Sequence, residues 1–379
     1  MPARVPLSIL ELSAFGSGRT PADGLRASID LARRAEQLGY ARFWLAEHHL
    51  NPGISGAAPH VLLPLIAQAT DSIRIGTAAT IIGNYAPLQV VEAAGVVSAL
   101  HPGRFDLGIG RSGSGRTPPE GPAPVARTVD GLLLPVPWPF PVDSDRFVAQ
   151  ARLLRRTAGD ADRFEQDVHD VLALIAGDYR APEGVPVHAT PAEGQDIDVW
   201  IHGTSAGPSA RLAGELGLPF GASYHVAPGT VLDAVAEYRR AFRPGRRDAP
   251  YVTVSVDVVV GETDDEARRL ASGYGRWVHS IRAGLGAVPF PAPDEAIAHP
   301  LTADEQRIVQ DRLDTQFVGS PATVAERLET LQRVTGADEL LVTTLTHDTA
   351  DRIRSFELLA EVWGLDGAGR VVETAGARA

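Results

Sequence analysis

Short apolar runs alternate with amphipathic segments along nearly the whole 379-residue chain. The apolar runs predict strands over residues 5–12, 41–47, 73–81, 104–110, 197–202, 219–225, 251–260 and 339–346. The segments between them predict helices over residues 25–38, 59–70, 87–100, 163–176, 205–216 and 228–242, from residue 264, and over 349–363. Repeated strand–helix units indicate an α/β fold, and their number is that of a (β/α)8 barrel, whereas a doubly wound sheet usually has about five or six strands. We therefore predict a single TIM barrel domain over residues 1–379.

Two long insertions interrupt this series, after the fourth and the seventh predicted strands. Residues 113–160 are rich in Gly and Pro, and residues 275–318 contain a Pro-rich stretch at 289–293. Both insertions leave from C-terminal strand ends, where the active-site loops of parallel barrels lie. They are therefore candidates to cover the C-terminal face of the barrel, although an irregular linker would have the same composition.

The net charge, the cysteine content and the apolar runs of the chain limit which partners it is expected to bind and where in the cell it is expected to work. The formal net charge is −12 and the pI is about 5.4, which disfavours binding to nucleic acid or to an anionic membrane. The chain has no cysteine, so disulfides, thiolate catalysis and thiolate metal ligands are excluded. The N-terminal residues do not resemble a signal peptide, and no apolar run reaches the roughly 18 residues that a membrane span needs. We expect a cytoplasmic protein.

The stretch 44–49, Trp-Leu-Ala-Glu-His-His, closes an apolar run just before the helix-breaking pair 51–52. Because side chains alternate along a strand, Glu47 and His49 should point one way and His48 the other. Adjacent histidines on a regular strand cannot easily share one metal ion. His48 is a candidate general base or cofactor partner, and a structural imidazole paired with a carboxylate is the alternative.

Residues 108–113, Gly-Ile-Gly-Arg-Ser-Gly, match the pattern of a dinucleotide-binding loop. That interpretation needs a helix to begin there, but prolines at 118 and 119 follow instead, so we reject it. What remains is a glycine-lined strand end that carries Arg111. A guanidinium beside open backbone suits a phosphate or an anionic ring edge, and a structural ion pair is the alternative.

Small and polar residues mark three further strand ends. Gly203, Thr204 and Ser205 lie between a strand and a helix, where they could bind an anion or simply cap the helix. The small residues 76–79 leave room for a flat ligand against the backbone, or pack in a crowded barrel interior. His225 ends the sixth predicted strand and is a candidate pocket residue. We interpret residues 319–321, Gly-Ser-Pro, as a helix cap.

Together these motifs resemble the luciferase-like monooxygenase family, the flavin-dependent relatives of bacterial luciferase. The resemblance is carried by residues 44–52, 73–79, 101–111, 203–205, 319–324 and 339–348. It implies a (β/α)8 barrel that binds reduced FMN, usually supplied by a separate flavin reductase. The reduced flavin then reacts with O2 to form a C4a-peroxyflavin, which oxygenates a small organic substrate.

The resemblance also assigns roles to residues of this chain. His48, with Glu47 beside it, matches the catalytic histidine, and Ala78–Ala79 matches a non-proline cis peptide bond behind the flavin ring. Arg111 and the residues Gly203, Thr204 and Ser205 match the phosphate site, and His225 matches a strand-six histidine near the cofactor. Family members commonly form homodimers through the helices that correspond to 59–70 and 87–100.

The chain departs from the luciferase pattern at three of these positions. Gly110 stands where luciferases have a cysteine, Gly203 stands where they have a glutamate, and Val226 follows His225 where an aromatic residue is usual. These differences argue against light emission from a long aldehyde and leave the organic substrate open.

Three other functions remain open from the sequence. A metal-dependent barrel hydrolase is suggested by His202, His225 and Asp348 at the ends of strands five, six and eight. Against it, the first strand has no His-x-His pair and Arg111 stands where a bridging lysine is wanted, so we predict no metal site. A non-catalytic flavin-binding protein and a deazaflavin-dependent oxidoreductase would use the same barrel.

Overall fold

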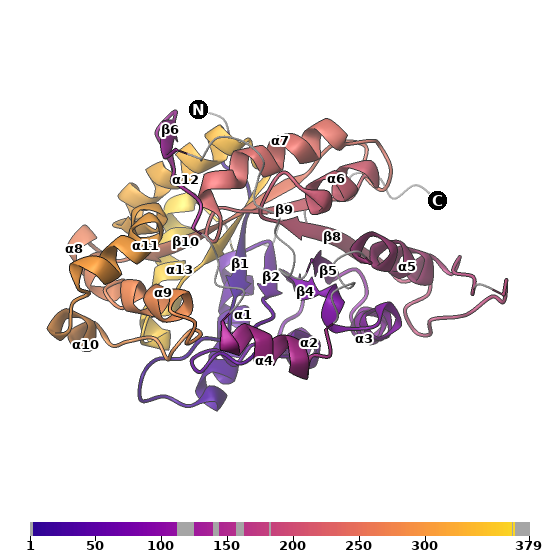
Figure 1. Ribbon diagram of the computed structural model, residues 1–379, viewed down its shortest axis with the longest axis horizontal. Helices are drawn as coiled ribbons and strands as arrows, with labels where there is room; N and C mark the ends of the chain where they lie inside the picture. Colours follow the sequence, from indigo (N-terminus) through magenta and orange to yellow (C-terminus); the bar gives the residue numbers. More distant parts are fainter. Residues whose placement is uncertain are drawn as a thin grey trace.

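The computed structural model describes residues 3–111, 125–138, 144–156, 163–181, 183–365 and 367. Within these residues, parallel strands form a closed barrel surrounded by helices, as the sequence predicts (Figure 1). The barrel strands are β1 (Leu7–Glu11), β2 (Arg42–Leu45), β3 (Arg74–Thr77), β5 (Phe105–Gly110), β8 (Ile197–Gly203), β9 (Phe220–Ser223), β10 (Val252–Val260) and β12 (Glu339–Thr343). The ring closes because β1 pairs with both β2 and β12, while β9 pairs with both β8 and β10.

The third predicted strand is divided in two. A cis peptide bond joins Ala78 to Ala79 between β3 and the short strand β4 (Thr80–Ile81). β3 and β4 each pair with β5, in separate registers. The wall of the barrel is therefore interrupted at its C-terminal end, beside Gly108 and Gly110 of β5.

Helices cover the outside of the barrel. They are α1 (Pro21–Leu38), α2 (Pro59–Ala69), α3 (Pro87–Leu100), α5 (Phe164–Ala176), α6 (Pro208–Glu215), α7 (Val231–Ala241), α12 (Pro321–Thr335) and α13 (Thr349–Trp363). Local signals define their ends: a capping box of Thr20 and Asp23 begins α1, and left-handed Gly39 ends it. The expected cap at Ser320 is confirmed as the N-cap residue of α12, with its hydroxyl bonded to that of Thr323.

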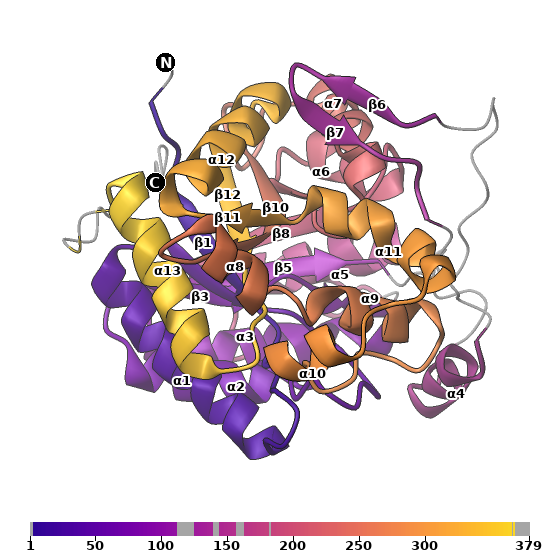
Figure 2. The ribbon, with the colours of Figure 1, turned by 90° about the vertical axis from the view of Figure 1, so that its left-hand side faces the viewer.

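The two insertions differ in what the structure describes. Of the first, the described parts are a hairpin of β6 (Arg127–Val129) and β7 (Leu132–Leu134), and helix α4 (Asp145–Leu153); residues 112–124, 139–143 and 157–162 lie outside the described residues. The second forms α9 (Tyr274–Arg282), α10 (Pro293–Ala298), α11 (Ala303–Thr315) and β11 (Phe317–Gly319), after the short α8 (Asp264–Leu270). In Figure 2, α4, α9 and α11 lie on the side toward which β5 points, the C-terminal side of the barrel.

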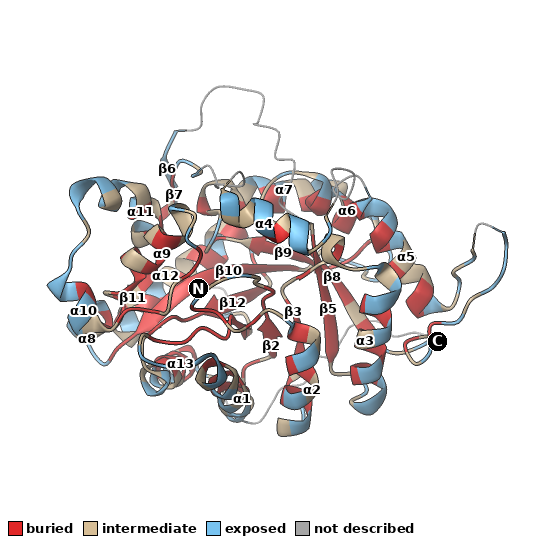
Figure 3. Cartoon of the chain, turned by 60° about the horizontal axis from the view of Figure 1, so that its bottom comes forward, coloured by how far each residue is buried: buried red, intermediate tan, exposed pale blue. Residues whose placement is uncertain are grey.

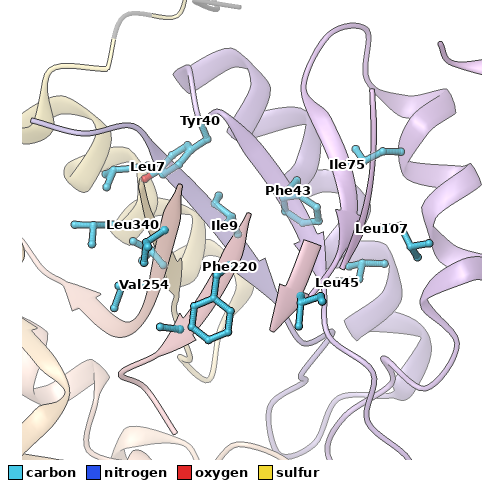
Figure 4. Packing of buried hydrophobic residues seen from close by; sticks show 14 of the residues in the cluster. Leu7, Ile9, Tyr40, Phe43, Leu45, Ile75, Leu107, Phe220, Val254 and Leu340 are labelled. Carbon is cyan, nitrogen blue, oxygen red and sulfur yellow. The ribbon is translucent and has the colours of Figure 1, made fainter. Parts of the chain in front are cut away.

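The hydrophobic core has two large parts and a small third cluster of Val259, Leu270 and Ala271. Outward-facing strand residues such as Leu7, Ile9 and Phe43 fill the space beneath the helices (Figure 4). A second cluster lies inside the barrel and continues into the second insertion, where Trp277 joins Trp44. The barrel strands are buried, and the helices around them expose mainly their outer faces (Figure 3).

A charged layer lies inside the barrel, below the aromatic layer of Trp44 and Trp200. Arg42 donates to Asp106 at 2.7 Å and to Glu339 at 3.1 Å, and Trp44 donates to Asp106 at 2.9 Å. These side chains are almost fully buried. Because buried charges are stable only when they are paired and hydrogen-bonded, this network fixes the strands beneath the upper end of the barrel. No helix in the described part of the chain is long and apolar enough to cross a membrane.

Candidate active site

A cavity of about 360 Å³ opens at the C-terminal ends of the barrel strands. Its wall takes residues from most strands of the barrel, with Leu10, Ala222 and Leu341 supplying apolar surface. The structure brings together all the site residues that the sequence indicates. These are Glu47, His48, Ala78, Ala79, Arg111, Gly203, Thr204, Ser205 and His225.

The end of β2 sends Glu47 and His48 to different environments. Glu47 is buried and accepts hydrogen bonds from the Ile81 backbone N–H at 3.0 Å and from the Asn84 amide, and it pairs with His49 at 2.8 Å. This carboxylate therefore fixes the segment that follows the cis peptide bond. His48 has no side-chain hydrogen bond within the described residues. Desolvation lowers its pKa to about 4, although the negative charge of Glu47 acts to raise it. It is a neutral imidazole at pH 7.

Where the barrel wall is interrupted, the Thr77 side chain joins β3 to the backbone of β5. The Thr77 hydroxyl donates to the Gly108 carbonyl at 2.9 Å and accepts from the Gly108 N–H at 3.1 Å. A side chain thus replaces the ladder bonds that are missing where the cis peptide bond turns the backbone. A Cβ on Gly110 would come within 3.1 Å of the Ala79 methyl group, so this glycine lets the wall pack closely.

Arg111 and the turn after β8 form one end of the cavity. Arg111 is half-buried and has no carboxylate partner within the described residues, so the structural ion pair left open by the sequence is not found. The helix that we expected to begin at Ser205 begins at Pro208, and Gly207 is its N-cap residue. Thr204 and Ser205 therefore do not cap α6, and both lie in the cavity wall. A free guanidinium beside a turn of small polar residues is a suitable anion site.

A second neutral histidine faces the cavity from the end of β9. His225 Nδ1 lies 2.6 Å from the Ser255 hydroxyl, which itself donates to the Ala222 carbonyl at 3.4 Å. The Ser223 hydroxyl lies 3.2 Å from the same nitrogen, so two serines orient the His225 ring. Desolvation lowers the pKa of His225 to about 4, and His48 contributes to the shift. The two histidines therefore belong to one electrostatic site.

The structure does not assemble the metal site of the hydrolase alternative. His202 and His225 line the main cavity, but Asp348 lies in a different cavity and pairs with Arg19 at 2.9 Å. Among the described residues, no group of three or more His, Cys, Asp or Glu side chains is arranged to hold a metal ion.

Sequence reasoning did not place Ser255 and Arg146 in this site, and it considered His202 only as a metal ligand. Ser255 orients His225, His202 lines the cavity floor, and Arg146 of α4 donates to the His49 carbonyl at 3.4 Å. The polar alternation 253-255-257 in a valine-rich strand was a usable signal for Ser255, because alternate residues face the barrel interior. Arg146 had no such signal, because its position depends on how the first insertion folds back.

Known proteins resemble this chain in sequence and in structure over nearly its whole length. The family model of luciferase-like monooxygenases matches residues 6–339. YvbT of Bacillus subtilis (strain 168) is 36% identical over 363 residues, covering 94% of this chain and 96% of that protein. The luciferase-like monooxygenase of Escherichia coli (strain K12) is 32% identical over 359 residues, covering 94% and 97%. Among solved structures, apo-MsnO8 has a TM-score of 0.78 at 31% identity, covering 96% and 99%. The chain therefore belongs to the luciferase-like monooxygenase family.

Proposed function

We propose that this protein uses reduced FMN and O2 to oxygenate a small organic substrate. One observation carries the proposal. A single cavity at the C-terminal face combines the cis peptide bond Ala78–Ala79, the guanidinium of Arg111, which is unpaired within the described part of the chain, and the neutral imidazole of His48. Family membership supports a monooxygenase, and the residues of this cavity support the finer assignment to FMN.

The residues present fit a flavin with a phosphate tail. The cavity volume of about 360 Å³ lies in the usual range of small-molecule sites, about 300–1,000 Å³. Arg111, Thr204 and Ser205 would hold the phosphate at one end of the cavity. The small residues Ala78 and Ala79 offer a flat backbone surface on which a ring system can lie.

The side chains around this cavity suggest how the reaction is supported. When bound and reduced, FMN supplies the electrons that activate O2. His48 and His225 are neutral at pH 7, so either imidazole can accept a proton from the substrate or donate a hydrogen bond to a reacting oxygen. Glu47 acts as a positioning residue, because its carboxylate is already occupied by Ile81, Asn84 and His49.

The insertions are suited to exclude water from this reaction. Tyr274, Trp277 and Val309 of the second insertion pack in the same cluster as Leu10 and Trp44 inside the barrel. Trp138 of the first insertion stacks under the guanidinium of Arg282 in the second, 4.7 Å from the ring centroid. We therefore propose that both insertions cover the C-terminal face, which would protect a reactive flavin from solvent.

The fold alone does not choose between FMN and a deazaflavin. The oxygenating constituent of 3,6-diketocamphane monooxygenase, with a TM-score of 0.65 at 19% identity, is in complex with FMN. An F420-dependent secondary alcohol dehydrogenase, with a TM-score of 0.59 at 16% identity, is in complex with an F420–acetone adduct. The more similar Escherichia coli relative is named a monooxygenase, which favours FMN here.

An anaerobic titration distinguishes these cofactors. The protein is titrated with reduced FMN and, separately, with reduced F420, and each complex is mixed rapidly with oxygenated buffer while absorbance is recorded. The proposal expects tight binding of reduced FMN and reoxidation kinetics that differ from those of free flavin. Binding of F420 alone, or FMN reoxidation as in free solution, would overturn it.

We further propose a homodimer and a separate reductase that supplies reduced FMN, as the family resemblance implies. Helices α2 and α3 pack against each other and expose apolar side chains, including Val61 at 70% and Leu100 at 72% of their surface. Such a face suits contact with a second copy of this chain. Sedimentation should show a dimer that Val61→Glu converts to a monomer, while Leu285→Glu, which changes an exposed leucine elsewhere, leaves it intact. A monomeric wild type would contradict the dimer.

A further inference from the structure

His202 is a polar side chain in the floor of the candidate cofactor cavity. It lies near the C-terminal end of β8, and its ring meets the edge of Trp44 with centroids 5.5 Å apart. Trp200, two residues earlier on the same strand, belongs to the aromatic layer below. His202 is therefore the polar residue that lies between this layer and the cavity.

The neighbouring strands leave space specifically for the His202 ring. A Cβ on Gly221 of β9 would lie 2.1 Å from His202 Nδ1. A Cβ on Gly108 of β5 would lie 2.8 Å from His202 Nε2, and 1.9 Å from the Thr77 carbonyl oxygen. Contacts below about 3.0 Å do not occur at real Cβ atoms, so both positions accept only glycine while the imidazole stays in place.

This imidazole has no internal hydrogen-bond partner at one of its nitrogens. His202 Nε2 is buried and unpartnered within the described residues. Desolvation lowers the pKa of His202 to about 4, so the ring is neutral at pH 7. A buried polar atom that lacks a partner is destabilising, and such atoms in proteins usually receive a partner from a ligand or an ordered water.

The position along β8 indicates which part of a ligand is nearby. Thr204, in the candidate phosphate turn, follows His202 by two residues, which corresponds to about 6.6 Å along an extended chain. In a flavin nucleotide, the part that adjoins the phosphate is the ribityl chain. This chain carries hydroxyl groups, each of which can donate and accept a hydrogen bond.

We infer that the His202 imidazole hydrogen-bonds a ribityl hydroxyl of the bound flavin. The inference rests on the proposed function and adds a cofactor contact that the family resemblance does not assign. Gly221, and Gly108 beside the Thr77 carbonyl, leave the space that the ring occupies. The contact is the same for FMN and for a deazaflavin, because both carry a ribityl chain.

The test compares FMN with a flavin analogue whose phosphate is attached through a plain five-carbon alkyl chain without hydroxyls. Both are titrated by fluorescence into the wild type, His202→Leu and His202→Asn. A neutral hydrogen bond is worth about 0.5–1.5 kcal/mol, so His202→Leu should weaken FMN about 2- to 12-fold and leave the analogue unchanged. His202→Asn should recover part of the loss, because the amide can reach the same hydroxyl.

Controls separate this inference from the proposed function. His169→Leu, which removes an exposed histidine from α5, should leave both affinities unchanged. A measurement without substitution uses 15N-labelled histidine, since the ring-nitrogen resonances of His202 should shift with FMN and not with the analogue. If the wild type binds FMN but neither signal depends on the ribityl hydroxyls, the inference is wrong and the proposed function stands. If the wild type binds neither flavin, the proposed function itself fails.

Discussion

Substitution of Arg111 by alanine should weaken FMN binding far more than riboflavin binding. Arg111 is half-buried and has no carboxylate partner among the described residues, so its guanidinium is free to pair with a phosphate. Charge-assisted hydrogen bonds contribute about 1.5–3 kcal/mol, and partial exposure to solvent places this one near the lower value. We therefore expect the Kd for FMN to rise about 10- to 30-fold, and that for riboflavin by less than about 2-fold.

The assay is a pair of fluorescence titrations at constant ionic strength with both flavins in the same redox state. Arg111→Lys keeps the charge but loses the planar fork, so its affinity for FMN should fall between those of the wild type and Arg111→Ala. Arg243→Ala removes an exposed charge elsewhere and controls for the change in net charge. Equal weakening of FMN and riboflavin by Arg111→Ala would show that Arg111 does not hold the phosphate.

Three other predictions follow from the same structure. His48→Gln should retain FMN binding but lose most product turnover, and unchanged turnover would remove this imidazole from the mechanism. Burial lowers the pKa values of His48, His202 and His225 to about 4 from the ordinary 6.5. Between these pH values the unfolded chain therefore binds more protons than the folded protein does. The melting temperature should fall as the pH falls from about 6.5 to 4, and it should fall less steeply in His202→Leu. Asp106→Asn should lower the free energy of unfolding by about 3–5 kcal/mol in urea titrations, because it leaves the buried charge of Arg42 partly uncompensated; a loss below about 1 kcal/mol would contradict this.

Much of the barrel could be predicted because its signals are local. An apolar run indicates a strand buried on both faces, and an amphipathic segment indicates a helix buried on one face. Gly39 and the Thr20–Asp23 pair define the ends of α1 within a few residues. The start of α6 was misplaced because Ser205 has the residue type of a cap. In the structure, Ser205 belongs to a turn in the cavity wall, and the helix begins after Gly207.

The candidate site was only partly accessible to the same reasoning. Polar residues after parallel strands meet at one end of a barrel, so His48, Arg111 and His225 could be grouped without coordinates. Residue type did not reveal which of these side chains lack a hydrogen-bond or ion-pair partner within the described residues. The Glu47 carboxylate already accepts a hydrogen bond from the Ile81 N–H and has neighbouring side chains as further partners. These contacts depend on the turn after the cis peptide bond.

The sequence by itself determined the order of strands and helices, and therefore which residues lie at the C-terminal ends of the strands. Only the tertiary structure decided which side chains share space across strands. His202, Gly108 and Gly221 illustrate the difference, because they lie on three neighbouring strands and nothing local in the chain links them. Secondary structure follows from patterns within a few residues. The environment of a buried polar group depends on segments far apart in the chain, and it appears only when the barrel closes.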